Sequence, residues 1–285
     1  MTAAMSDQTL TWIDTHVHWD APEFDLDRDA ALQRARAAGV VCCINPSVTA
    51  AGIDAVRALA MVSAERPDWP CILPAFGIHP LYVIESHRQD LDLLERMLRE
   101  ARPVAVGEIG LDRYAGAPDF KSQCTLFEAQ LHLAATYALP VVLHVRHAVE
   151  EVIQRLKRVQ GTAQRIPGGI AHAFNGSREQ AEQLIRMGFV LGFGGSCTYE
   201  GSLRIRSLLQ TLPLSALVLE TDAPDMSPAW GHGQRNESSQ LVRIAETVAM
   251  LREMPLAELS SATRQNVARI FVTDQDGAHT QSVGL

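Results

Sequence analysis

The chain has 285 residues, of which 47% are hydrophobic and 20% are charged, as is usual for a soluble globular protein with a large core. The formal net charge of −8 and the lack of an apolar run long enough to cross a bilayer argue against a nucleic-acid coat and against a membrane protein. Five cysteines without a CxxC pair, and no signal-peptide pattern, favour a cytoplasmic protein without disulfides.

Short apolar runs rich in β-branched residues alternate along the chain with amphipathic helical patterns. We expect strands in residues 11–18, 39–47, 71–80, 103–112, 140–146, 168–176, 189–196 and 216–224. We expect helices in residues 27–39, 51–65, 89–101, 119–139, 147–159, 177–188 and 200–212, followed by two more in 237–254 and 255–271.

The expected strands are almost continuously apolar, which is typical of strands covered on both faces. Eight such strands alternating with helices, in a chain of this length, predict an α/β fold, a (β/α)8 TIM barrel. We expect one domain spanning 11–272, with an N-terminal extension (1–10) and a flexible polar tail (273–285). A doubly wound open sheet is the alternative, but no GxGxxG follows the first strand, which weakens it.

Histidines and carboxylates gather at the ends of the expected strands. The stretch "IDTHVHWD" places His16 and His18 two residues apart, so that on a strand both face the same side. All strands of a barrel end at one mouth, where active sites lie. Six residues from five segments are therefore expected to meet there as metal ligands: His16, His18, Glu108, His144, His172 and Asp222.

Six nitrogen and oxygen ligands are enough for two divalent ions, each completed by water. Glu108 is placed to bridge them, and Asp222 to bind metal, to take a proton from water, or to do both; these two carboxylates are the predicted catalytic residues. Imidazole and carboxylate ligands suit Mg, Mn or Zn, and ligand type alone does not choose among them.

Further residues near the strand ends are candidates for supporting roles. His79, in "FGIHP", is surplus to six ligands and is assigned to the substrate phosphate or to a proton transfer. Arg146, two residues after His144, and Arg113, after "GEIGLD", are predicted to bind substrate, with surface ion pairs as the alternative. Asp14 and Glu220 each precede a candidate ligand by two residues and are expected to orient ligands.

The motifs "DTHVH", "GIHP", "GEIGLD", "LHVR", "AHAFNGS", "ETDAP" and "QRNE" together resemble those of the TatD-type metal-dependent hydrolases. The resemblance runs from about Thr11 to Phe271 and is most specific in "GEIGLD" and "ETDAP". It implies a TIM barrel with a dinuclear site. In that site His16, His18 and Asp222 hold one ion, His144 and His172 hold the other, and Glu108 bridges.

The resemblance also implies a magnesium- or manganese-dependent nuclease, often a 3′ exonuclease on single strands. Two departures affect substrate choice: the motif that commonly reads "HCFSG" has Ala173 and Asn175 here, and Arg113 precedes Tyr114 after "GEIGLD". Neither departure removes a ligand.

Three functions fit these residues. The first is a phosphodiesterase acting on nucleic-acid ends such as single-stranded DNA. The second is an ester or amide hydrolase, such as a D-aminoacyl-tRNA deacylase or a small-molecule amidohydrolase, which the same metal site would serve. The third is a metal-bound scaffold without activity. The sequence does not fix the oligomeric state.

Overall fold

Eight parallel strands form one sheet in the computed structural model, which describes residues 10–83, 88–161 and 165–271. The strands are β1 (Trp12–Asp14), β2 (Val40–Pro46), β3 (Cys71–Phe76), β4 (Ala105–Asp112), β5 (Val141–Arg146), β6 (Gly169–Ala171), β7 (Phe189–Phe193) and β8 (Leu217–Leu219). Each pairs with the next in sequence, and a parallel bridge between Val17 and Ala223 joins the two ends of the sheet. The expected TIM barrel is confirmed, and the open doubly wound sheet is excluded.

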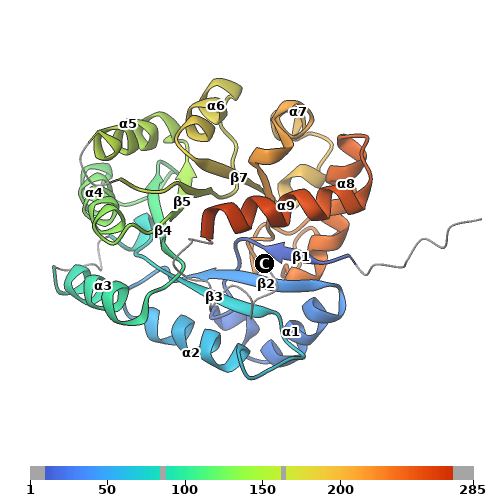
Figure 1. Ribbon diagram of the computed structural model, residues 1–285, viewed down its shortest axis with the longest axis horizontal. Coiled ribbons are helices and arrows are strands. Elements are labelled where there is room, and N and C mark those ends of the chain that lie inside the picture. The colour runs from blue at the N-terminus through green and yellow to red at the C-terminus, as the bar shows by residue number, and fades with distance from the viewer. Residues whose placement is uncertain (1–9, 84–87, 162–164, 272–285) are drawn as a thin grey trace, which may run out of the picture.

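The helices surround the barrel, as Figure 1 shows. They are α1 (Arg28–Ala37), α2 (Ile53–Ser63), α3 (Arg88–Ala101), α4 (Phe120–Thr136), α5 (Val149–Gln160), α6 (Arg178–Arg186), α7 (Leu203–Thr211), α8 (Leu241–Leu251) and α9 (Leu256–Phe271). Local sequence determines where two of these helices begin. Ser177 and Gln180 form a capping box at the start of α6, and Asp119 accepts the Ser122 N–H at the start of α4.

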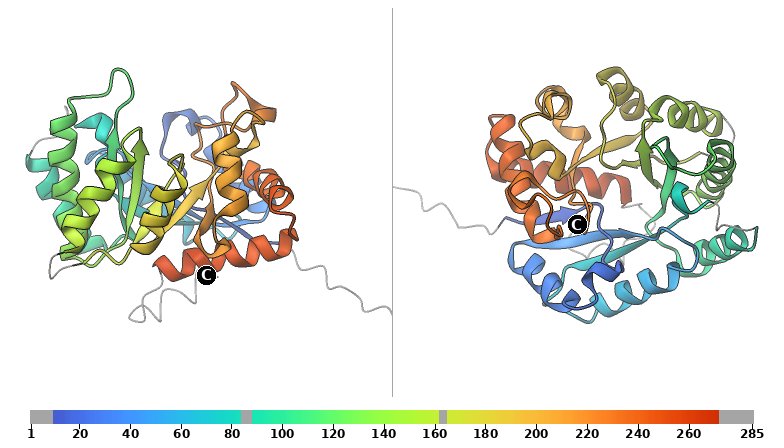
Figure 2. Two further views of the ribbon diagram at one scale, coloured as in Figure 1. Left: turned by 90° about the horizontal axis from the view of Figure 1, so that it is seen from above. Right: turned by 180° about the vertical axis from the view of Figure 1, so that it is seen from behind.

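One end of the barrel is closed by α9, which lies across the strand starts (Figure 2, left). Val267 and Ile270 of α9 pack against the barrel interior. That interior is an apolar cluster with one or two members from each of the eight strands: Ile13, Cys42, Ile44, Ala75, Ala105, Val142, Ile170, Val190 and Val218. Because this end is filled and apolar, polar chemistry is confined to the opposite end, where the strands finish.

Three strands are shorter than expected at the end that bears candidate ligands. β1 stops at Asp14, β6 at Ala171 and β8 at Leu219. Asp222 and Ala173 have φ of 57° and 45°, which breaks the extended backbone just past β8 and β6. The chain leaves the sheet there and turns its polar side chains over the mouth.

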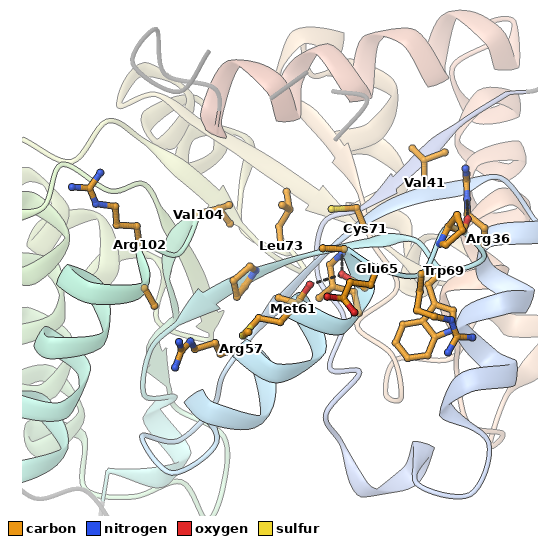
Figure 3. A pocket seen from close by; sticks show the side chains of 18 of the residues that line it. Arg36, Val41, Arg57, Met61, Glu65, Trp69, Cys71, Leu73, Arg102 and Val104 are labelled. Carbon is orange, nitrogen blue, oxygen red and sulfur yellow. Dashed lines mark hydrogen bonds between the residues drawn. The ribbon is translucent and has the colours of Figure 1, made fainter. Parts of the chain in front are cut away.

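A separate hollow of about 1100 Å³ lies at the strand-start end, beside α2 and the beginning of β3 (Figure 3). Met61, Cys71 and Leu73 line it together with Arg57 and Arg102. It contains none of the predicted metal ligands and lies on the wrong side of the barrel for them.

No helix in the described part of the chain is long and apolar enough to cross a membrane. The five cysteines are all free thiols. The expected extension (1–10, apart from Leu10) and the expected tail (273–285) lie outside the described residues.

Candidate metal centre

The six predicted ligands converge at the mouth of the barrel around one carboxylate, that of Glu108. Glu108 lies in β4 and is almost completely buried. His144 comes from β5, and the other four follow the ends of β1, β6 and β8: His16, His18, His172 and Asp222. The structure thus brings together side chains that are up to about two hundred residues apart in sequence.

One oxygen of Glu108 faces the pair of histidines that follow β1. Its Oε2 lies 3.3 Å from His16 Nε2 and 3.6 Å from His18 Nε2. Asp222 Oδ1 approaches the same two nitrogens at 3.5 and 3.7 Å. These four atoms outline a first group of nitrogen and oxygen donors.

The other oxygen of Glu108 faces histidines from the next strands round the barrel. Its Oε1 lies 2.9 Å from His144 Nδ1 and 3.0 Å from His172 Nε2. Glu108 therefore stands between two groups of donors, with one oxygen directed to each.

Hydrogen bonds on the outer side of two rings set which nitrogen carries the proton. His18 Nδ1 lies 3.3 Å from the carbonyl oxygen of Pro46, and His144 Nε2 lies 3.0 Å from Asp112 Oδ2. In the neutral rings each outer nitrogen therefore donates, which leaves the inner nitrogen with its lone pair directed into the centre. That is the state in which an imidazole binds a metal ion.

The donor set fits divalent cations. His16 Nε2 and His18 Nε2 lie only 3.1 Å apart, and His16 Nδ1 is buried with no hydrogen-bond partner in the described part of the chain. Lone pairs this close repel one another unless a proton or a cation lies between them. Carboxylate and imidazole donors within this distance are the ligands that Mn, Zn and related ions take.

The pKa shifts of the groups at the centre also indicate a site for cations. Burial works to raise the pKa of Glu108, but the surrounding histidines, His16 first, hold it well below its ordinary value. Burial works to lower the pKa of His144, yet hydrogen bonds from it to Asp112 and Glu108 leave that pKa raised. Burial raises the pKa of Asp222 to about 6. The negative charge of these carboxylates must therefore be balanced by positive charge, either from protons on the histidines or from bound cations.

His79 lies beside the centre but with the opposite proton arrangement. Its Nδ1 accepts the backbone N–H of Leu81 at 3.2 Å, so the neutral ring carries its proton on Nε2. That Nε2 lies 3.6 Å from Glu108 Oε1. Burial lowers the pKa of His79 to about 3, in keeping with a neutral ring. His79 therefore presents an N–H donor to the mouth rather than a lone pair.

Asp112 is a residue of the centre that the sequence analysis assigned no role. Its buried carboxylate accepts from His144 at 3.0 Å and from the Tyr114 backbone N–H at 2.6 Å. It lies four residues after Glu108 in β4, and this even spacing within a strand was the available signal.

The two carboxylates expected to orient ligands act through different partners. Glu220 accepts the Ala173 N–H at 2.5 Å, and its Oε1 lies 3.6 Å from His172 Nδ1, so it supports a histidine. Asp14 accepts the Thr221 N–H at 2.9 Å and the hydroxyls of Thr221 and Ser238, both at 2.6 Å. Asp14 therefore fixes the residue before Asp222 rather than a histidine ring.

The predicted substrate-binding arginines differ in their surroundings. Arg113 forms an ion pair with Glu151 at 2.6 Å and lies over the ring of Phe120. Arg146 is exposed and lies over the ring of Tyr114, and it makes no ion pair with the described residues. Of the two arginines, Arg146 is the one without an ion pair among the described residues.

A parallel barrel whose mouth gathers four imidazoles and two carboxylates has the architecture of a metal-dependent hydrolase. The family model described as TatD related DNase matches residues 13–272. The chain belongs to the TatD family of metal-dependent hydrolases.

Relatives of this chain match it over nearly their whole length. The uncharacterized metal-dependent hydrolase YjjV of Escherichia coli K12 is 39% identical, covering 91% of this chain and 97% of the relative. A protein of Erwinia tasmaniensis named 3'-5' ssDNA/RNA exonuclease TatD is 34% identical, covering 90% and 98%. The crystal structure of E. coli YjjV superposes with a TM-score of 0.84 at 38% identity, covering 92% and 98%.

Proposed function

We propose that the protein is a phosphodiesterase that removes nucleotides from the 3′ end of single-stranded DNA at a centre holding two divalent ions. His16, His18 and Asp222 would hold one ion, His144 and His172 the other, and Glu108 would bridge them. The observation that carries this assignment is the placement of Glu108, whose two oxygens each face a separate pair of imidazoles. Two bound ions would lower the pKa of a water molecule and stabilise negative charge on the phosphoryl oxygens.

The chain's own residues complete the reaction. Asp222 lies 3.5 and 3.7 Å from the two histidines through Oδ1, so its carboxylate is placed at the centre to accept a proton from the attacking water. His79 Nε2–H donates to a phosphoryl oxygen, where charge grows as the bond breaks. Arg146 binds a backbone phosphate of the substrate, because its guanidinium is exposed and unpaired among the described residues.

Two observations support a nucleic-acid end as the substrate. The net charge of −8 disfavours binding along a duplex, whereas one arginine at the mouth suffices to hold a single backbone phosphate near the end of a strand. The Erwinia tasmaniensis relative carries the name of a 3'-5' exonuclease on single-stranded DNA and RNA.

The test is hydrolysis of single-stranded DNA labelled at the 3′ end, by protein stripped of metal and then supplied with Mg²⁺ or Mn²⁺. We expect trimming only with added metal, and its loss in Glu108→Gln and in Asp222→Asn. His132→Gln, an exposed histidine on α4, is the matched control and should behave as wild type. No cleavage by metal-loaded wild type would overturn the nuclease assignment and direct attention to ester substrates such as aminoacyl-tRNA.

A further inference from the structure

An arginine and a tyrosine form a stacked pair on the rim of the mouth. Arg146 ends β5, and Tyr114 follows β4 by two residues. The Arg146 guanidinium carbon lies 3.8 Å from the centroid of the Tyr114 ring. The two loops are joined by the Arg113 N–H, which donates to the Arg146 carbonyl at 2.9 Å. The pair is thus held in place by backbone as well as by the stack.

The same carboxylate that orients a candidate metal ligand also positions this tyrosine. Asp112 accepts the Tyr114 N–H through Oδ1 at 2.6 Å and faces His144 Nε2 through Oδ2 at 3.0 Å. His144 in turn contacts Glu108. Asp112 therefore links the Tyr114 backbone to the histidine that contacts Glu108.

Apart from its stack with Arg146, the Tyr114 side chain is open to solvent. Its side chain is 53% exposed, and its hydroxyl forms no hydrogen bond with the described residues. The other exposed aromatic side chains among the described residues have partners: Trp230 donates to Gln240 at 2.8 Å, and the Tyr82 ring lies edge-on beside His79, with ring centroids 6.2 Å apart. Since the guanidinium covers one face of the Tyr114 ring, the exposed part of the side chain offers the other.

The stack prepares Arg146 as well. A guanidinium lying flat on a ring keeps its N–H edges free for a phosphate, and the ring restricts its rotamers before substrate arrives. An aromatic face beside a cation is the combination by which proteins bind single-stranded nucleic acid, because every nucleobase can stack while the cation holds the backbone.

We propose that Tyr114 and Arg146 form a nucleotide-binding element, in which Tyr114 stacks an unpaired nucleobase and Arg146 binds the adjacent backbone phosphate. The inference rests on the proposed function, since it takes the substrate to be a nucleic-acid end. It also explains why the substrate should be single-stranded, because a base that is already stacked and paired in a duplex cannot stack on Tyr114.

The test pairs changes in the protein with changes in the substrate. Binding of a fluorescein-labelled DNA oligonucleotide to metal-free protein is measured by anisotropy for wild type, Tyr114→Ala and Tyr114→Phe. A second set of oligonucleotides carries one abasic site at each of the last three positions in turn. Tyr137→Ala, at the residue that follows the end of α4, is the control and should bind as wild type.

We expect Tyr114→Ala to bind the intact oligonucleotide roughly 10-fold more weakly, the usual effect of losing one stacked base. Tyr114→Phe keeps the ring and should bind as wild type. At one position, removing the base should weaken wild type by the same factor and leave Tyr114→Ala unaffected. If Tyr114→Ala and the abasic site weaken binding by independent factors at every position tested, the stacking proposal is wrong.

Arg146→Gln separates the two halves of the element. It should weaken intact and abasic oligonucleotides equally and lower the salt dependence of binding by about one phosphate contact. Cleavage assays distinguish this inference from the function beneath it. If metal-loaded wild type cleaves DNA and Tyr114→Ala has the same kcat/KM, the element is wrong and the nuclease stands; if wild type does not cleave, the function itself fails.

Discussion

Glu108 and His144 meet through the less common nitrogen of the imidazole: Glu108 Oε1 lies 2.9 Å from Nδ1 of His144, while Nε2 points away to Asp112. The ring orientation follows from Asp112, whose buried carboxylate accepts the Nε2 proton. Asp112 thereby determines which nitrogen of His144 offers its lone pair to the centre.

We expect Asp112→Asn to bind metal about 10- to 100-fold more weakly, the usual cost of removing the partner of a metal-binding histidine. The amide keeps the bond from the Tyr114 N–H through its oxygen and turns its NH₂ toward His144. His144 then carries its proton on Nδ1, so the nitrogen that faces the centre no longer offers a lone pair to the metal. Isothermal titration with Mn²⁺ measures the effect.

Asp54→Asn, an exposed change on α2, is the matched control for that titration. It should leave affinity unaltered. Wild-type affinity in Asp112→Asn would show that Asp112 does not set the state of His144.

His79→Asn should leave metal content unchanged while lowering kcat by roughly 100-fold, as does loss of one donor to a developing oxyanion. Asparagine still accepts the Leu81 N–H at the start of its short helix, but its shorter amide withdraws the donor from the mouth. Elemental analysis of the purified variant, combined with turnover, separates the two roles. Loss of one metal equivalent would mean that His79 is a ligand instead.

Gly192→Ala should destabilise the fold by about 1–3 kcal/mol, the usual cost of overpacking a core. A Cβ at Gly192 in β7 would lie 2.0 Å from Glu220 Oε2, and Glu220 is buried against Ala173 and His172. Urea unfolding monitored by circular dichroism gives the difference. Gly201→Ala is the control, since no atom lies within 4 Å of its Cβ position. Equal stability of the two variants would show that Glu220 is free to move.

Metal affinity should rise with pH through the range above 6.5, the ordinary pKa of histidine. The pKa values of His144 and His172 are raised in the metal-free protein: burial opposes this, but their carboxylate partners outweigh it. A cation must displace those protons, so binding is weaker on the acid side and releases protons when it occurs. Titrations in two buffers of different ionisation enthalpy count the protons. Heats that do not depend on the buffer would contradict this linkage.

The fold could be predicted from the sequence because each strand carries an apolar run that is buried on both faces. The residues at which the strands end were harder to predict. The sequence pattern places His16, His18, His172 and Asp222 in strands, yet all four lie beyond strands that stop early. Left-handed residues such as Ala173 turn the chain out of the sheet there. The expectation that they meet at one mouth still held, because every strand finishes at that end.

The residues that gather at the mouth could be predicted from the sequence, but the positions of their protons could not. No spacing in the sequence shows that Leu81 donates to His79, or that Pro46 accepts from His18. The surroundings of the arginines were hidden for the same reason: Arg113 pairs with Glu151, which lies 38 residues further along the chain. Such contacts depend on which helices become neighbours in the barrel.

The central claim is that Glu108 bridges two ions, and anomalous diffraction from crystals loaded with Mn²⁺ tests it most directly. The account predicts two peaks flanking Glu108, one among His16, His18 and Asp222 and the other between His144 and His172. A single peak, or two peaks that do not share Glu108, would contradict it.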